Sequence, residues 1–566
     1  MIDYGQKRKI MPYILGYTRL PIDNVYYDAR LAYSLHLAVS KDGKKFTALN
    51  HNSGVLFAKA TENDDGSLNP KTIKLPVIFK EDEGAFGVAA LRFGGDGEDD
   101  SESQGKAFVF HTKDFLEYSD AEEIELSEYE KIKAAADMVG SKSSTTDGIE
   151  GAVPQNIIEI SDSVYDRLCK KLGERVNIGV TVVEPVETTS PEDLKKITAI
   201  AHYSDGTTAT KKIDWDMSSV DFSKKGVQTL RGKIHQEHFE FPLALNRADP
   251  DVFKWNGKYY FIATNDADQN HTLYIREADT ISGLATAPET LLLDSKTYEG
   301  IGGLLWAPEF HEIKGKLYIL HAATPGEFFW EESHIMCLRE GGNPANRDDW
   351  SAPKRVCRAD GTDICEAGKE ITLDMTCFEW QGEYYAIWSQ RQFLPKDLGA
   401  WLYIAKINPD EPWKLASDPI VLSKPDYGWA NNHTFVDEGP FALIRGDRLF
   451  ITFSSAAVDT SYVVGLLQIE KGKDLLNRKN WKKTGYPLLT SRSMPGEFGT
   501  GHNAYVIDDD GEIWNTYHAR PGTDAPRSSG IRRVHFDIDG EPVLDLTEDR
   551  DVLKDFRDIK IKIEVK

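Results

Sequence analysis

The chain has 566 residues and a formal net charge of −24, with 40% hydrophobic and 28% charged residues. This length is too great for one compact core and indicates two to four domains. The negative charge disfavours nucleic acids and anionic membranes as partners, because both carry the same sign. The sequence also has no run of 18 apolar residues from which a membrane span would be predicted. Neutral substrates are therefore expected.

The cysteines and the N-terminal sequence bear on the cellular compartment. Five cysteines, an odd number without a CxxC pair, argue against a disulfide framework and a zinc cluster and favour reduced thiols. The first ten residues, MIDYGQKRKI, lack the apolar stretch of a secretory signal. Together these features predict a cytoplasmic protein.

Residues 1–150 predict a β module. Strand-like segments alternate with turns rich in Asp, Gly and Asn, at 33–40, 55–58 and 106–111. Segment 74–90 matches a strand-turn-strand pattern that recurs five times later in the chain, but Leu75 stands where the first of those copies has Asp249. We expect a degenerate propeller-like module without the acid. It would pack on the C-terminal domain, close its pocket or mediate a homo-oligomer.

Residues 151–240 predict a second β domain, which follows a Ser/Thr/Gly-rich joint. An Asp-Gly pair at 205–206 lies between two alternating segments and indicates a hairpin. The YSDGT motif of 203–207, followed by Trp215 and a Lys-Gly turn, resembles bacterial immunoglobulin-like domains. The resemblance implies a β-sandwich that serves as a spacer or packing module.

Residues 241–566 contain five copies of one pattern, in which a strand starts at an ionisable side chain and leads through a Gly-centred turn into an aromatic-rich strand. The copies lie at 248–263, 307–321, 373–388, 437–453 and 501–517. Their turn glycines recur at intervals of 58 to 67 residues, which is enough for four strands and their loops. Such a period indicates a repeat architecture, and five units of four strands predict a five-bladed β-propeller.

Each copy carries one ionisable residue six to nine positions before its turn glycine: Asp249, Glu309, Asp374, Glu438 and His502. The first strand of each propeller blade lines the central channel, so these side chains would converge in one acidic pocket. An Asp before Pro, or a Glu-Gly-Pro sequence, is by itself typical of a turn. Recurrence at one position of a repeat favours a catalytic interpretation.

The motifs RADPDVF, LWAPEFH, LDMTCF, DEGPF and GHNAY follow one another in this order between residue 246 and about residue 550. They resemble the motifs of glycoside hydrolase family 43, whose five-bladed propellers cleave arabinofuranosides and xylosides with inversion. The resemblance implies that Asp249 is the general base, Glu438 the general acid, and Asp374 the carboxylate that orients the acid and sets its pKa. Burial and the like charge of Asp374 are expected to raise the pKa of Glu438.

Aromatic side chains beside these motifs are candidate platforms for sugar rings, because apolar ring faces pack on the C–H faces of sugars. They are Trp306, Phe310, Phe378 and Trp429. Arg520 matches a position that in relatives reaches substrate hydroxyls, and an inter-blade salt bridge is its alternative role.

Two further polar residues have open interpretations. Glu309 is expected to be structural rather than a fourth catalytic group. The resemblance implies that His502 faces the channel and helps to hold a hydrated Ca²⁺ on the propeller axis, where water supplies most ligands. The alternative is a buried histidine that is satisfied by its neighbours. No cofactor is expected for the reaction itself.

The predicted function is therefore that of an inverting exo-glycosidase, most specifically an α-L-arabinofuranosidase that acts on arabinose- or xylose-containing oligosaccharides. A β-xylosidase or galactofuranosidase of the same family is an alternative, and a non-catalytic carbohydrate-binding protein is another. Retaining fructosidases also have five blades, but their WMNDP and Glu-Cys motifs are absent from the sequence.

Overall fold

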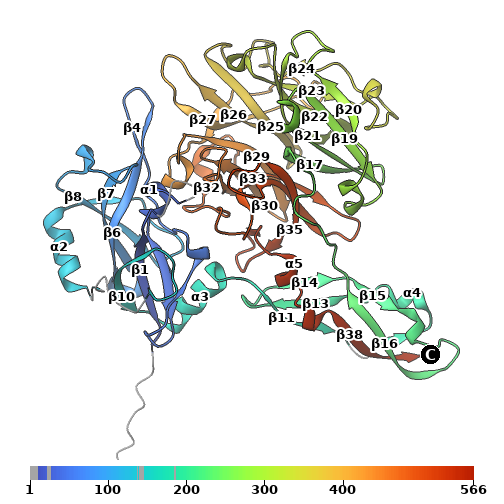
Figure 1. The fold of residues 1–566 in the computed structure, drawn as a ribbon, viewed down its shortest axis with the longest axis horizontal. Coiled ribbons are helices and arrows are strands. Elements are labelled where there is room, and N and C mark those ends of the chain that lie inside the picture. The colour runs from blue at the N-terminus through green and yellow to red at the C-terminus, as the bar shows by residue number, and fades with distance from the viewer. Residues whose placement is uncertain (1–10, 22–26, 137, 139–145, 184–185) are drawn as a thin grey trace, which may run out of the picture.

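The computed structural model describes residues 11–21, 27–136, 138, 146–183 and 186–566 (Figure 1). The C-terminal part contains five consecutive antiparallel sheets, the first four with four strands and the fifth with three. Their strands are β17 (Arg247–Trp255), β18 (Lys258–Asn265), β19 (Thr272–Ala278), β20 (Thr290–Asp294); β21 (Gly303–Ile313), β22 (Lys316–Thr324), β23 (Glu332–Cys337), β24 (Lys354–Arg355); β25 (Glu370–Trp380), β26 (Glu383–Gln392), β27 (Gly399–Lys406), β28 (Ile420–Ser423); β29 (Asp437–Arg445), β30 (Arg448–Ser455), β31 (Val463–Glu470), β32 (Lys482–Lys483); and β33 (Phe498–Ile507), β34 (Ile513–Arg520), β35 (Ser528–Arg533).

The first strands of the five sheets form a closed ring. β17 contacts β21, β21 contacts β25, β25 contacts β29, β29 contacts β33, and β33 returns to β17. Closure of this kind leaves each sheet packed face to face between two neighbours and protects its edges. The predicted five-bladed β-propeller is confirmed.

Each first strand is interrupted by a β-bulge near its middle. One residue in every bulge has a positive φ angle: Asp249 (50°), Ala307 (44°), Asp374 (53°), Gly439 (55°) and His502 (52°). A bulge bends the strand and re-aims a side chain, and these devices are common beside active sites. The five bulges therefore define the structurally equivalent positions around the axis.

Among the described residues, the N-terminal module contains two four-stranded sheets, one two-stranded hairpin and three α-helices. The strand orders are β10-β1-β2-β3 and β6-β7-β8-β9. Their bounds are β1 (Tyr13–Arg19), β2 (His36–Ser40), β3 (Thr47–Ala48), β6 (Lys71–Lys80), β7 (Phe86–Gly94), β8 (Lys106–Thr112), β9 (Glu122–Glu125) and β10 (Ala152–Glu159), with the hairpin β4 (Thr61–Glu62) and β5 (Leu68–Asn69) and the helices α1 (Ala29–Ala32), α2 (Leu126–Ala135) and α3 (Asp162–Leu172). The module extends beyond residue 150, where its C-terminal limit was predicted. Strand β10 pairs with β1, and Leu168 and Leu172 of α3 belong to the hydrophobic core of the module.

The sheet β6-β7-β8-β9 is built like a propeller blade. Strand β6 has a bulge between Lys74 and Val77, and Leu75 within it has a φ of 51°, close to the 50° of Asp249. The hydroxyl of Tyr129 on α2 donates a hydrogen bond of 2.9 Å to the carbonyl of Leu75. The match between segment 74–90 and the propeller pattern therefore extends to the backbone.

A second module combines strands from the middle and the end of the chain. One sheet has the order β11-β13-β14 and the other β12-β38-β16-β15. The bounds are β11 (Asn177–Val182), β12 (Val186–Thr188), β13 (Ala199–Tyr203), β14 (Thr208–Lys211), β15 (Ile213–Asp216), β16 (Gly226–Ile234) and β38 (Asp558–Val565), with helix α4 (Pro191–Leu194). Strand β38 pairs with both β16 and β12, and Figure 1 shows it in red among green strands. The predicted range of 241–566 for the propeller therefore includes a strand of this module. The resemblance to an immunoglobulin-like domain stays a prediction.

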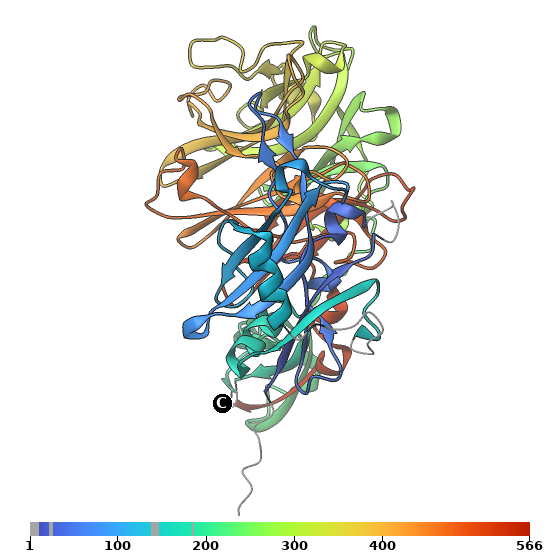
Figure 2. The same cartoon turned by 90° about the vertical axis from the view of Figure 1, so that its left-hand side faces the viewer.

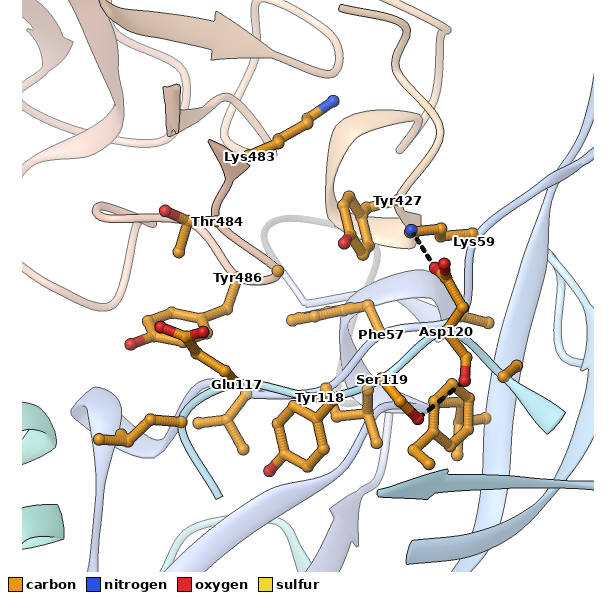
Figure 3. Close-up of a pocket in the computed structure, with 18 of the residues that line it drawn as sticks. Phe57, Lys59, Glu117, Tyr118, Ser119, Asp120, Tyr427, Lys483, Thr484 and Tyr486 are labelled. Atoms are coloured by element: carbon orange, nitrogen blue, oxygen red, sulfur yellow. Dashed lines mark hydrogen bonds and ion pairs between the residues drawn. The ribbon is translucent and has the colours of Figure 1, made fainter. Parts of the chain in front are cut away.

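The N-terminal module packs against the side of the propeller (Figures 1 and 2). One continuous hydrophobic core joins its residues to Trp429 and Phe453. A cavity of about 480 Å³ lies at this junction, lined on one side by Phe57 and Tyr118 and on the other by Tyr427 and Tyr486 (Figure 3). It contains none of the predicted catalytic carboxylates. None of the helices in the described ranges is long and apolar enough to cross a membrane.

Candidate active site

Asp249 lies in the bulge of β17 and is held by three positively charged or polar side chains. Its Oδ1 atom is 2.9 Å from Nδ1 of His518 on β34, 3.2 Å from Nδ1 of His502 on β33, and 3.2 Å from the Arg527 guanidinium. The side chain is buried. These contacts orient one oxygen of the carboxylate and place it inside the ring of first strands.

The charge of Asp249 depends on Arg527. Burial alone would raise the pKa of this carboxyl, but the Arg527 guanidinium, followed by His502 and His518, holds it well below its usual range. Burial also lowers the pKa of His502 to about 4 and lowers that of His518, so both rings are neutral near pH 7. Arg527 therefore supplies the positive charge that keeps Asp249 ionised, and Asp266 fixes the guanidinium by an ion pair of 2.9 Å.

The pKa of Glu438 is shifted in the opposite direction from that of Asp249. Burial raises its pKa to about 7, the hydrogen bond from Tyr462 lowers it, and the charge of Asp249 raises it. The Tyr462 hydroxyl donates to Oε1 of Glu438 over 2.7 Å. A carboxyl with such a pKa retains a proton near neutral pH and can donate it.

Asp374 lies in the bulge of β25 and contacts the strand that carries Glu438. Its Oδ2 accepts a hydrogen bond of 3.0 Å from the backbone N–H of Gly439. Burial and the charge of Glu438 raise the pKa of Asp374 well above its usual value. The charge of Asp249 in turn raises the pKa of Glu438, so like charge acts on both carboxyls. The hydrogen bond from Gly439 ties Asp374 to the backbone next to Glu438.

The bulges revise the alignment of the five ionisable residues. Counted from the ends of the hairpins, Ala307 is equivalent to Asp249, and Glu309 is equivalent to Asp251. Glu309 is buried, and its Oε2 lies 2.9 Å from Nε2 of His311. Glu438 precedes its own bulge residue, Gly439, by one position. Sequence spacing from the turn glycine therefore located the strands that carry these residues but not their register.

His502 lies beside Asp249, and its contacts limit where a cation could bind. Asp249, His502 and His518 each offer a ligand atom within 4.8 Å of the others. The Arg527 guanidinium already neutralises the negative charge of Asp249, so a cation does not fit among these three atoms. Nε2 of His502 is buried and has no hydrogen-bond partner, so this atom fits a ligand on the other side of the ring.

The structure separates the predicted aromatic platforms. Trp306 is half-buried beside the bulge of β21, and its Nε1 donates a hydrogen bond of 2.8 Å to Asn270. Phe310 is 1% exposed and packs in a hydrophobic core, and Phe378 lies in another core against Tyr385. Trp429 is fully buried. Phe310 and Phe378 have no face free for a sugar, because these strand residues point into hydrophobic cores. Trp429 has none either, because its 3₁₀ turn packs into the core shared with the N-terminal module.

Arg527, and not the predicted Arg520, contacts Asp249. The Arg520 guanidinium donates hydrogen bonds to the carbonyls of Ala525 (2.7 Å) and Val458 (2.9 Å), which braces the loop that leads to Arg527. Arg527 lies 3.2 Å from Asp249 and was not predicted. Its only signal in the sequence is a second arginine seven positions after Arg520. Tyr462 was also missed, because nothing in its local sequence marks it as the partner of an acid.

The arrangement can carry out acid–base chemistry on a bond placed between two blades. A closed five-bladed propeller that presents an ionised carboxyl on β17 and a protonated one on β29 has the features of a glycoside hydrolase.

Comparison with known proteins agrees with this class. The family model for glycosyl hydrolases family 43 matches residues 242–542, and the chain belongs to this family. An extracellular exo-α-(1→5)-L-arabinofuranosidase of Streptomyces chartreusis is 33% identical over 284 residues, which cover 50% of this chain and 82% of that protein. A protein of the same name from Streptomyces avermitilis is 32% identical over 314 residues, 54% of this chain and 62% of its own length. The chain therefore spans less than two thirds of the latter.

A solved structure is also similar. The crystal structure of an α-L-arabinofuranosidase from Lactobacillus brevis shares 31% sequence identity, with a TM-score of 0.48, over 53% of this chain and 94% of that one. The relatives correct one prediction. Both Streptomyces proteins are named extracellular, which contradicts the cytoplasmic location expected from the N-terminal sequence and the cysteines.

Proposed function

We propose that the protein is an exo-acting, inverting α-L-arabinofuranosidase. The observation that carries the proposal is the contrast between two carboxyls on different blades: Arg527 holds the pKa of Asp249 well below its usual range, whereas burial raises the pKa of Glu438 to about 7. The names of the similar proteins support arabinose as the released sugar. The neutral character of such a substrate is compatible with the strongly negative chain.

In the proposed mechanism, Asp249 removes a proton from a water molecule, and that water attacks the anomeric carbon of the sugar. Glu438 gives its proton to the glycosidic oxygen as the bond to the leaving group breaks. A single displacement from the opposite face inverts the anomeric configuration. Asp374 holds the acid in place through Gly439, and Arg527 keeps the base ionised.

We propose further that Nε2 of His502 contacts a hydrated Ca²⁺ on the propeller axis. The buried, unpartnered ring nitrogen supports this role. When bound, the cation would add positive charge to the pocket. Metal analysis of the purified protein before and after chelation tests it. Loss of calcium in His502→Ala, but not in His311→Ala, is the expected result, and a metal-free wild type would contradict it.

Hydrolysis of nitrophenyl α-L-arabinofuranoside and nitrophenyl β-D-xyloside tests the proposed activity. We expect release from the arabinofuranoside by the wild type and none by Asp249→Ala, which controls for contaminating enzymes. Proton NMR of the first sugar released should show the β-anomer. Release from the xyloside alone would assign the glycosidase to xylose, and release from neither would leave activity on another furanoside, such as a galactofuranoside, or a binding protein.

A further inference from the structure

Three consecutive aromatic residues are exposed on one short loop of the propeller. Phe328, Phe329 and Trp330 form a 3₁₀ turn between β22 and β23, with exposed fractions of 39%, 48% and 50%. No other Phe or Trp of the described residues reaches this class of exposure. Exposed aromatic residues that gather in one place mark binding surfaces more often than isolated ones do.

The three side chains form a surface with Phe393, which directly follows β26. The ring centroids of Phe328 and Phe329 lie 5.7 and 4.9 Å from that of Phe393, both in edge-to-face geometry. We call these four residues the aromatic rim. The contacts among Phe328, Phe329 and Phe393 hold these three rings in place, so a ligand that stacks on them would cost little of their side-chain entropy.

The aromatic rim continues from the candidate active site. The ring of Phe328 lies 6.1 Å from that of Trp306. Trp306 is in turn bonded to Asn270, and Asn270 donates a hydrogen bond of 3.0 Å to Asp266, the ion-pair partner of Arg527. A chain of direct contacts therefore joins the catalytic base to the inner edge of the rim.

The far side of the rim lies against β25, the strand that carries Asp374, because the backbone N–H of Thr372 donates a hydrogen bond of 3.1 Å to the carbonyl of Glu331. The Arg391 guanidinium lies 5.0 Å from the centre of the Phe393 ring, and the charge of Arg391 acts to lower the pKa of Glu438. Glu331, the residue after Trp330, is fully buried, and its pKa is raised by burial and by the charge of Asp374. Arg391 and Glu331, on this side of the rim, therefore interact electrostatically with Glu438 and Asp374 respectively. The acid protonates the leaving group, so a surface on its side contacts the leaving group.

We propose that the aromatic rim binds the sugar residues of the leaving group beyond the one that is attached to the released arabinose. This inference rests on the proposed function and adds a preference for oligosaccharides over disaccharides. Phe328 lies next to Trp306 and serves the nearer residue, whereas Phe329 and Trp330 serve the farther ones. Their ring faces stack on the C–H faces of the sugars, while the hydroxyl groups stay in water.

The test compares kcat/KM for α-(1→5)-linked arabinobiose and arabinotetraose. The wild type should favour the tetrasaccharide by roughly fivefold to tenfold, as expected from two stacking contacts. The double variant Phe329→Ala/Trp330→Ala should lose this preference and keep its activity on the disaccharide within about twofold. Ile507→Ala, a substitution at a side chain that is 58% exposed outside the rim, is the control and should keep the preference.

The outcomes separate the inference from the function on which it rests. Failure of the wild type to hydrolyse nitrophenyl α-L-arabinofuranoside would overturn both. Hydrolysis without a preference for the tetrasaccharide, or a preference that survives in the double variant, would overturn the rim alone. An equal loss on both substrates would show that the rim supports the structure of the site instead. Sedimentation of the wild type and double variant would reveal self-association through the rim, and a change there without a change in preference would also overturn the inference.

Discussion

Strand β6 of the N-terminal module and strand β17 of the propeller share a backbone and differ in chemistry. Both have a bulge with a residue at a φ of about 50°, Leu75 in one and Asp249 in the other. Asp249 is buried among two histidines and an arginine, whereas Leu75 is 41% exposed. Only the backbone carbonyl of Leu75 accepts the hydrogen bond from Tyr129. The bulge is therefore a property of the blade, and catalysis requires the residues that surround it.

The largest expected effect is the loss of the base. Asp249→Asn removes the proton acceptor but keeps the shape of the side chain, so kcat on an arabinofuranoside should fall by roughly 10³-fold. Adding Leu75→Asp to this variant should restore nothing, because an exposed aspartate has no Arg527 beside it. Recovery of activity in the double variant would show that the N-terminal blade can act as a catalytic site.

Loss of Arg527 should come next. In Arg527→Met the guanidinium no longer opposes burial, so the pKa of Asp249 rises and the base becomes protonated at higher pH. We expect kcat/KM near pH 7 to fall by roughly tenfold to a hundredfold, with the acidic limb of the pH profile at higher pH. Arg527→Lys retains a charge and should lose less. A uniform loss at every pH, with an unmoved acidic limb, would contradict this role.

Tyr462→Phe should shift the alkaline limb of the pH profile of kcat/KM. Glu438 must carry its proton, so kcat/KM should decline as the pH rises through its pKa of about 7. The Tyr462 hydroxyl favours the ionised carboxylate, and its removal raises the pKa further. The decline should therefore move to higher pH in Tyr462→Phe. Tyr505→Phe, which removes a buried hydroxyl bonded to Thr452 instead, is the matched control and should leave the limb in place.

The smallest effect concerns stability. Leu75→Gly relieves a left-handed backbone conformation that costs an L-residue about 1–2 kcal/mol, less the greater chain entropy of glycine. We expect the free energy of unfolding to rise by up to about 1 kcal/mol, with unchanged activity. Leu245→Gly, at an exposed leucine without a positive φ, should lower it. Equal effects at both positions, measured by thermal unfolding, would show that the bulge is not strained.

The propeller, and the first strands on which Asp249 and Glu438 lie, could be predicted from the sequence, because hairpins and their turn glycines are local and recur. The register could not, since a bulge breaks the two-residue alternation that sequence patterns rely on, and Glu309 was matched to Asp249 instead of to Asp251. Phe310 and Phe378 follow the polar motifs in sequence but turn into the cores between blades.

Residues that act from loops or from distant strands left no local pattern. Arg527 is placed by the loop that Arg520 braces, and Tyr462 by the stacking of its ring on His518 at 5.4 Å. The aromatic rim depends on Phe393, which is far from Phe328 in sequence. Such contacts follow from the closed ring of blades, so they become visible only after the ring is built.

Strand β38 has a consequence for the order in which the chain acquires its structure. Its partners β16 and β12 are synthesised before the first blade, yet β38 follows the last one. The edge of β16 that pairs with β38 therefore stays uncovered during synthesis until the propeller has been made. A fragment that contains only residues 151–240 would lack one of the two central strands of the sheet β12-β38-β16-β15.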